Sequence, residues 1–131
     1  MTDSILRKIK KVLLGFPELG LAIIYGSFAT GNEKATSDID IAIAANSKIS
    51  IEELVKVQTQ LSNATSREID LIDLNAATGT VFKEALTKGV TILKLDDELY
   101  AKILSRMLFQ QADFEPLRNR ILEARRKKVL G

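Results

Sequence analysis

The stretch of residues 19–25 constrains the fold most strongly. It is a short and almost continuously apolar run that Gly26 ends directly. Such a run is far shorter than a membrane span, and its pattern is typical of a strand that is buried on both faces. The rest of the chain must therefore supply neighbouring strands and the helices that cover them.

Three further segments have strand character. Residues 38–44 alternate between isoleucine on one side and aspartate or alanine on the other, and residues 67–74 and 90–95 are short strand-like runs. The intervening segments show helical spacing of apolar residues at 5–13, 51–61, 81–86 and 99–108. We therefore expect an α/β fold, a small mixed β-sheet of about three or four strands flanked by helices.

Several polar residues and glycines mark the ends of these elements. Ser50, with Glu53 three residues later, forms a capping box at the start of one helix, and Gly89 ends the next. The segment 26–37 is rich in Gly, Ser, Thr and Asn, which indicates a turn or loop, with one helical turn starting at Ser27 as an option. The length of 131 residues fits a single domain, with a core at about 19–95 and C-terminal helices at about 96–128.

Histidine and cysteine are both absent from the sequence. The chain therefore lacks the usual base at neutral pH, thiolate nucleophiles, disulfides and the commonest zinc ligands. Any chemistry must rest on carboxylates, hydroxyls, lysines or a bound hard cation. With neither a signal-like N-terminus nor a membrane span of about 18 apolar residues, we expect a cytoplasmic protein that does not enter a membrane.

Asp38 and Asp40 are two residues apart on an expected strand, so the pleat turns both carboxylates to the same face. Two like charges held close together are costly unless a cation neutralises them. Carboxylate oxygens of this kind suit Mg²⁺ that is bound together with substrate phosphates. A Ser-Asp pair at a strand entrance is also common in ordinary turns, but Asp40 inside an apolar strand is harder to explain structurally.

Gly26 and Ser27 follow the first strand directly. A glycine there lets the backbone approach a phosphate, which makes this turn a candidate phosphate cradle; the alternative is an ordinary turn. Asp70 lies on the expected strand at 67–74 and is a third candidate carboxylate, or else a solvent-facing residue of an edge strand. Asp73 points to the other face of that strand, and we interpret it as structural.

Three carboxylates and two metal ions would support an in-line displacement at phosphorus. One ion lowers the pKa of the attacking hydroxyl and the other stabilises the departing pyrophosphate. This chemistry needs no histidine, which makes it one of the few mechanisms that the composition allows.

The spacing of these residues resembles a known family. Gly26-Ser27, ten residues, and then Asp38-Ile39-Asp40 look like the signature of the DNA polymerase beta-type nucleotidyltransferase superfamily. The sequences GSFATG and SDIDIAI are close to its minimal nucleotidyltransferase branch, and the resemblance covers roughly residues 19–95. It implies a polymerase beta-like fold in which Ser27 lies by the triphosphate, Asp38 and Asp40 bind metal, and Asp70 is the third carboxylate.

Members of this branch are often antitoxins of two-gene systems whose toxin is a HEPN-domain ribonuclease. The resemblance therefore implies a Mg²⁺-dependent transferase that moves AMP from ATP, or from another nucleoside triphosphate, to a tyrosine of its HEPN toxin. Such a chain would form a hetero-oligomer with that partner, and it would act as the transferase half of the pair.

Two other functions stay open. One is transfer to a small hydroxylated molecule, although relatives with that activity normally carry an added acceptor-binding domain. The other is a non-catalytic module that neutralises a toxin by occlusion, for which the intact set of carboxylates would serve no purpose. Direct nucleic-acid binding is not expected, because no aromatic platform is evident. We interpret the basic residues 125–128 as a solvated surface, or as a contact for RNA or an acidic partner.

Overall fold

The computed structural model describes residues 2–30, 38–110, 120–121 and 124. Nine elements follow one another in these ranges and alternate between helix and strand. They are α1 (Thr2–Leu14), β1 (Leu21–Tyr25), α2 (Gly26–Thr30), β2 (Ile39–Ala44), α3 (Ile51–Thr65), β3 (Ile69–Asp73), α4 (Gly79–Lys88), β4 (Val90–Lys94) and α5 (Asp97–Gln110). None of the helices in the described ranges is both long and apolar enough to cross a membrane.

The four strands form one mixed sheet in the order β3-β2-β1-β4. β1 pairs antiparallel with both β2 and β4, whereas β2 and β3 are parallel. The parallel pair is possible because α3 carries the chain back to the start of the sheet between the two strands. The predicted fold class, a small mixed sheet flanked by helices, is therefore confirmed, and β1 is buried along its whole length.

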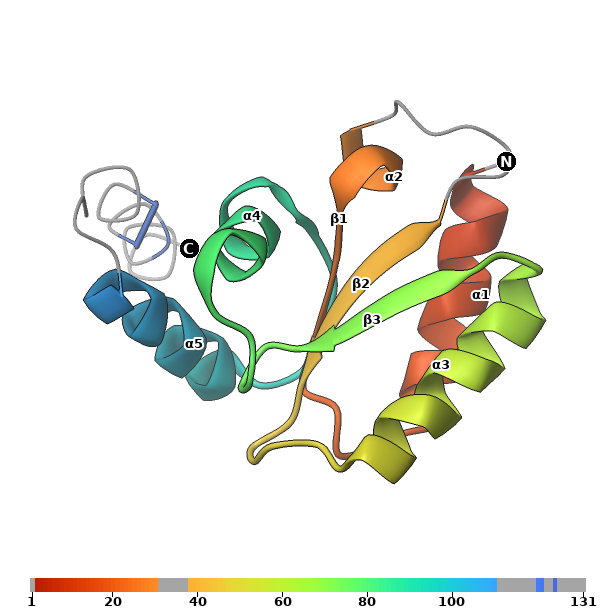
Figure 1. Ribbon diagram of the computed structural model, residues 1–131, viewed down its shortest axis with the longest axis horizontal. Helices are drawn as coiled ribbons and strands as arrows, with labels where there is room; N and C mark the ends of the chain where they lie inside the picture. Colours follow the sequence, from red (N-terminus) through yellow and green to blue (C-terminus); the bar gives the residue numbers. More distant parts are fainter. Residues whose placement is uncertain (1, 31–37, 111–119, 122–123, 125–131) are drawn as a thin grey trace.

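Helices cover both faces of the sheet (Figure 1). α1 and α3 lie together on one face, and α4 and α5 lie on the other, while the short helix α2 sits at the end of β1. α3 begins as predicted, because the Ser50 side chain accepts a hydrogen bond from the Glu53 N–H at 3.2 Å. The helix predicted at 99–108 is present as α5, whereas residues 31–37, most of the residues after 110 and the basic tail 125–128 lie outside the described residues.

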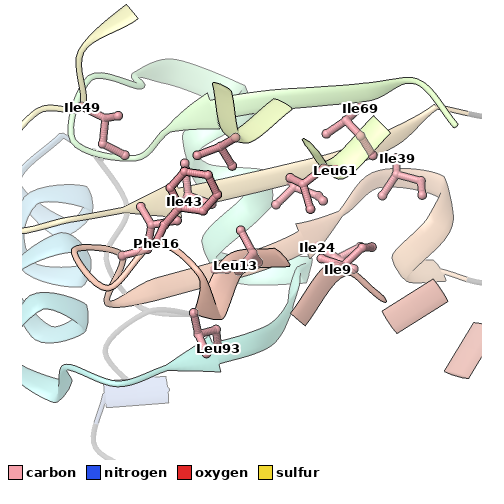
Figure 2. Close-up of a cluster of buried hydrophobic side chains, with 14 of the residues drawn as sticks. Ile9, Leu13, Phe16, Ile24, Ile39, Ile43, Ile49, Leu61, Ile69 and Leu93 are labelled. Atoms are coloured by element: carbon pink, nitrogen blue, oxygen red, sulfur yellow. The ribbon is translucent and has the colours of Figure 1, made fainter. Parts of the chain in front are cut away.

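The face under α1 and α3 is closed by a large apolar cluster (Figure 2). Ile39, Ile41 and Ile43 of β2 point into it, as their alternation predicts. They pack against side chains of α1, β1 and α3, including Ile9, Leu13, Ile24 and Leu61.

A second cluster fills the opposite face, between the sheet and α4 and α5. Its largest fully buried side chain is Phe82 of α4. The guanidinium of Arg106 on α5 lies 4.2 Å from the centre of that ring and donates hydrogen bonds to the carbonyls of Leu74 and Asn75. Arg106 thus ties α5 both to α4 and to the end of β3.

Gly89 fixes how closely α4 approaches β1. A Cβ at this position would lie 2.3 Å from the Ala85 carbonyl oxygen and 2.4 Å from the Ile23 side chain. Any larger residue would push the end of α4 away from the sheet. This close packing holds α4 against the face of the sheet that carries Tyr25 and Asp40.

Candidate active site

A row of three polar side chains crosses the sheet on the α4 face. Tyr25 of β1 pairs with Asp40 of β2, and Asp40 pairs with Asp70 of β3. Residues opposite one another in a sheet point to the same face, so the two carboxylates become direct neighbours although they are far apart in sequence. The structure therefore brings together two of the three carboxylates that the sequence singled out.

Asp40 is the middle member of this row and lies between Tyr25 and Asp70. Burial raises its pKa to about 6, and further contributions come from the charge of Asp70, from a hydrogen bond between the two carboxyl groups, and from the charges of Asp38 and Glu84. Negative charge is thus concentrated at one place on the sheet. Such a concentration is unfavourable in the absence of a positive partner.

Asp38 precedes β2 and its side chain is exposed, as is that of Asp70. Asp38 is close enough for its charge to act on Asp40. Among the residues that the structure describes, however, no three acidic side chains already lie in an arrangement that would hold a metal ion. The structure thus pairs Asp40 with Asp70 and places Asp38 nearby, but the three described carboxylates do not form a complete metal site.

The Gly26 backbone lies directly against the Asp40 carboxylate. Gly26 has a φ of +73°, and a Cβ at this position would lie 2.3 Å from Oδ2 of Asp40. Only glycine combines this left-handed conformation with so close an approach. Ser27 follows as a half-buried residue of α2, so the Gly-Ser turn and the carboxylate pair belong to one site.

The residues present fit a divalent cation. The side chains of Asp38, Asp40 and Asp70 offer carboxylate oxygens, which Mg²⁺ prefers. The repulsion that raises the pKa of Asp40 is the kind that a bound cation would relieve. Phosphate oxygens of a nucleotide could complete the coordination, because Mg²⁺ is usually shared between carboxylates and substrate phosphates.

Two residues near the site carry no signal in the sequence. Tyr25 is only 6% exposed, and its pKa is raised by burial and then by the charges of Asp40, Asp70 and Glu84. Tyr25 reads in the sequence as the last apolar residue of a strand. Glu84 is one of several charged residues on α4, and only the docking of that helix on the sheet brings its charge near Asp40.

Asp73, at the other end of β3, has a different environment. It is 5% exposed, and its two carboxylate oxygens accept hydrogen bonds from the N–H groups of Ile49 at 2.8 Å and Asn75 at 2.9 Å. These bonds hold the loop before α3 against the turn after β3. The contacts agree with a structural role for Asp73.

A Gly-Ser turn at the end of one strand, beside paired carboxylates on the next two strands, is the arrangement of a nucleotidyltransferase fold. Residues 7–98 match the family described as polymerase beta, nucleotidyltransferase. The chain belongs to this family, and the resemblance drawn from its motifs is confirmed.

Relatives and solved structures agree with this assignment. The chain is 32% identical over 110 residues to the protein adenylyltransferase MntA of Shewanella oneidensis, covering 81% of this chain and 79% of that protein. It also resembles a chain of a toxin–antitoxin crystal structure with AMP-PNP, with a TM-score of 0.70, 25% identity, and coverage of 89% and 98%. A third similarity is to a chain of the complex between tri-AMPylated Shewanella oneidensis HEPN toxin and MNT antitoxin, with a TM-score of 0.67, 27% identity, and coverage of 93% and 99%.

Proposed function

We propose that this chain is a protein adenylyltransferase, which transfers AMP from ATP to a hydroxyl group of a HEPN toxin and thereby acts as its antitoxin. The observation that carries the proposal is the pairing of Asp40 with Asp70, directly beside the Gly26 backbone. The adenylyltransferase relative and the similarity to toxin–antitoxin complexes support the choice of nucleotide and partner.

In this proposal, Gly26 and Ser27 bind the phosphates of ATP, and Asp38, Asp40 and Asp70 hold one or two Mg²⁺ ions. When bound, Mg²⁺ would neutralise the charge that develops on the phosphate oxygens and lower the pKa of the attacking hydroxyl. The site is then suited to ATP because the cation offsets the repulsion between the carboxylates and the triphosphate.

The reaction is a displacement at the α-phosphorus. The acceptor oxygen forms a bond to this phosphorus while the bond to the bridging oxygen breaks, and pyrophosphate leaves on the opposite side. The hydroxyl proton passes to the Asp70 carboxylate, which lies at the outer end of the polar row and acts as the base. Because ATP is a cytoplasmic substrate, we place this reaction in the cytoplasm.

The decisive test uses α-labelled ATP. The purified chain and its Asp38→Ala/Asp40→Ala variant are incubated with Mg²⁺, labelled ATP and a purified HEPN toxin. We expect the wild-type chain, but not the variant, to label the toxin. A chelator that removes Mg²⁺ should abolish this labelling. Equal complex formation by both forms with no transfer by either would favour the occluding module instead.

A further inference from the structure

The short helix α2, which carries the Gly-Ser turn, is too short to be stable by itself. It has only five residues, Gly26–Thr30, and a helix of this length gains too little from its own hydrogen bonds. It sits at the end of β1 (Figure 1). The position of Ser27 therefore depends on the contacts that α2 makes with the rest of the molecule.

Phe28 fastens α2 to the face of the sheet that is covered by α1 and α3. Its side chain is 5% exposed and belongs to the apolar cluster of that face, together with Ile39 and Ile69. The Gly26 backbone, in contrast, lies against the carboxylate of Asp40, which belongs to the opposite face. α2 thus contacts both faces of the sheet.

The guanidinium group of Arg67 lies over the ring of Phe28. Its Cζ atom is 5.7 Å from the ring centre, within the distance at which a cation is attracted to an aromatic face. Arg67 is half-buried in the turn between α3 and β3, three residues before Asp70. This contact therefore joins the helix that carries the Gly-Ser turn to the strand that carries Asp70.

The Arg67–Phe28 contact spans the start of a strand to which neither residue belongs. In the sheet, β2 lies between β1, which α2 follows, and β3, which Arg67 precedes. Asp38 immediately precedes β2. The contact therefore links the two outer parts of the proposed site, the Gly-Ser turn and Asp70, across the middle part.

Hydrogen bonds fix the backbone from which the Arg67 side chain extends. Ser66 ends α3 in the left-handed conformation, with a φ of 57°, and the Arg67 N–H donates to Oγ1 of Thr65 at 3.3 Å. The next residue, Glu68, accepts a hydrogen bond at its carbonyl from the Ile39 N–H at 2.9 Å. Because this turn is held against β2, the guanidinium group projects toward α2 from a fixed point.

We propose that Arg67 is a positioning residue for nucleotide binding, which holds α2, and with it the Gly26–Ser27 turn, in a fixed place relative to Asp70. This inference rests on the proposed function, in which the turn binds the phosphates of ATP. Arg67 acts through Phe28 and does not touch the nucleotide. A partly exposed contact of this kind shifts an equilibrium by roughly two- to fivefold. Its loss should weaken nucleotide binding by that factor and leave toxin binding unchanged.

The first experiment measures nucleotide affinity without an acceptor, as the Kd for AMP-PNP with Mg²⁺ by calorimetry. Arg67→Gln should raise this Kd by up to about fivefold, whereas Arg67→Lys, which keeps a cation beside the ring, should raise it less than about twofold. Lys94→Gln is the matched control. It removes a cation that lies 5.3 Å from the ring centre of Tyr100, beside Leu21 at the other end of β1, and should leave the Kd unchanged. An unchanged Kd in Arg67→Gln would overturn the proposal.

A double-mutant cycle separates positioning from direct attraction between Arg67 and the phosphates. Phe28→Leu keeps an apolar side chain in the cluster but removes the aromatic ring. In the Phe28→Leu background, Arg67→Gln should change the Kd by less than about 1.5-fold, because the contact is already lost. An equal loss of affinity in both backgrounds would mean that Arg67 acts on the nucleotide itself, and the positioning role would be wrong.

Amide hydrogen exchange tests the position of α2 with neither nucleotide nor toxin present. Arg67→Gln should speed exchange of the α2 amides by roughly two- to fivefold, while the amides of β1 keep their rates and the urea midpoint equals that of Lys94→Gln. A lower urea midpoint with unchanged exchange in α2 and unchanged nucleotide affinity would make Arg67 merely structural and overturn the proposal.

The same measurements distinguish failure of this inference from failure of the proposed function. Faster exchange of α2 in Arg67→Gln, without any nucleotide binding by the wild-type chain, would refute the proposed function and leave the Arg67–Phe28 contact as the support of α2. Unchanged exchange and affinity in Arg67→Gln, with AMP transfer by the wild-type chain, would refute the positioning role and leave the proposed function intact.

Discussion

Asp70 and Asp73 lie three residues apart on β3, yet their carboxylates have opposite surroundings. Asp73 is buried and accepts hydrogen bonds from two backbone N–H groups. Asp70 is exposed and faces Asp40, whose carboxylate repels it. β3 thus carries one aspartate, Asp73, whose carboxylate is hydrogen-bonded to the backbone, and another, Asp70, whose carboxylate is exposed and available to a ligand. This difference separates a residue that holds the structure from one that serves the proposed chemistry, and four predictions test it.

The largest effect is expected for Asp40, the carboxylate that pairs with Asp70. Asp40→Asn removes a carboxylate that we place on the metal, so AMP transfer should fall about 1,000-fold, equivalent to roughly 4 kcal/mol of transition-state stabilisation. The measurement is the initial rate of label transfer from α-labelled ATP. Asp97→Asn, which changes an exposed aspartate at the start of α5, is the control. If Asp40→Asn transferred AMP at more than a tenth of the wild-type rate, the proposed metal-binding role of Asp40 would be wrong.

Asp73→Ala should act on stability instead. It leaves the buried N–H groups of Ile49 and Asn75 without their acceptor, which should lower the free energy of unfolding by about 3 kcal/mol. Urea unfolding measures this loss. Transfer per folded molecule, assayed at low temperature, should stay within about twofold of wild type. If that activity fell as far as in Asp40→Asn, the contrast between the two aspartates of β3 would be wrong.

Gly26→Ala sharpens the link between the turn and the row. Its φ of +73° and the contact with Asp40 should together cost about 2 kcal/mol of stability, and the displaced carboxylate should slow transfer. Gly79→Ala is a matched control, since Gly79 has a φ of +70° but a Cβ there would meet no atom of the described residues within 4 Å. Only about 1 kcal/mol and no loss of transfer are expected there. Equal behaviour of the two variants would mean that contact with Asp40 is unimportant.

The smallest effect concerns pH. The pKa of Asp40 is 3.8 in the unfolded chain and about 6 in the folded protein, so its contribution to stability falls as the pH rises through this window. After allowance for solvent screening, Asp40→Asn should be more stable than wild type by about 1 kcal/mol at pH 7, with no gain below about pH 4. Urea unfolding at both pH values, without divalent cations, measures the difference. A gain that persists at the lower pH would point to a cause other than ionisation.

Much of the fold follows from periodicity. The isoleucines of β2 alternate into one core, Ser50 caps α3, and the positions of all four strands were predictable because each is a short segment with clear apolar patterning. The nucleotidyltransferase class was predictable from the Gly-Ser turn and the spacing to Asp38 and Asp40, and the family match confirms it. The roles of the individual site residues stay predictions.

Other features depend on packing between elements that are distant in sequence. The pairing of Asp40 with Asp70 requires the register of β2 on β3 that the structure has, and a slip by one residue would separate them. The proximity of Glu84 requires the docking of α4, which depends on the close approach at Gly89. The cavity lined by Asp38, Gln58, Ser62, Glu68, Ile69 and Asp70 combines residues of α3, of β3 and of the chain before β2 and β3, so no local pattern indicates it.

The parallel pairing of β2 with β3 also has a consequence for synthesis of the protein. A ribosome completes the Gly-Ser turn, Asp38 and Asp40 about 30 residues before it adds Asp70. At a synthesis rate of roughly 5–20 residues per second, Asp70, the proposed base, is added about 2 to 6 seconds after the first half of the site. Only when α3 has reversed the direction of the chain and β3 has joined the edge of the sheet does a nascent molecule acquire the complete row.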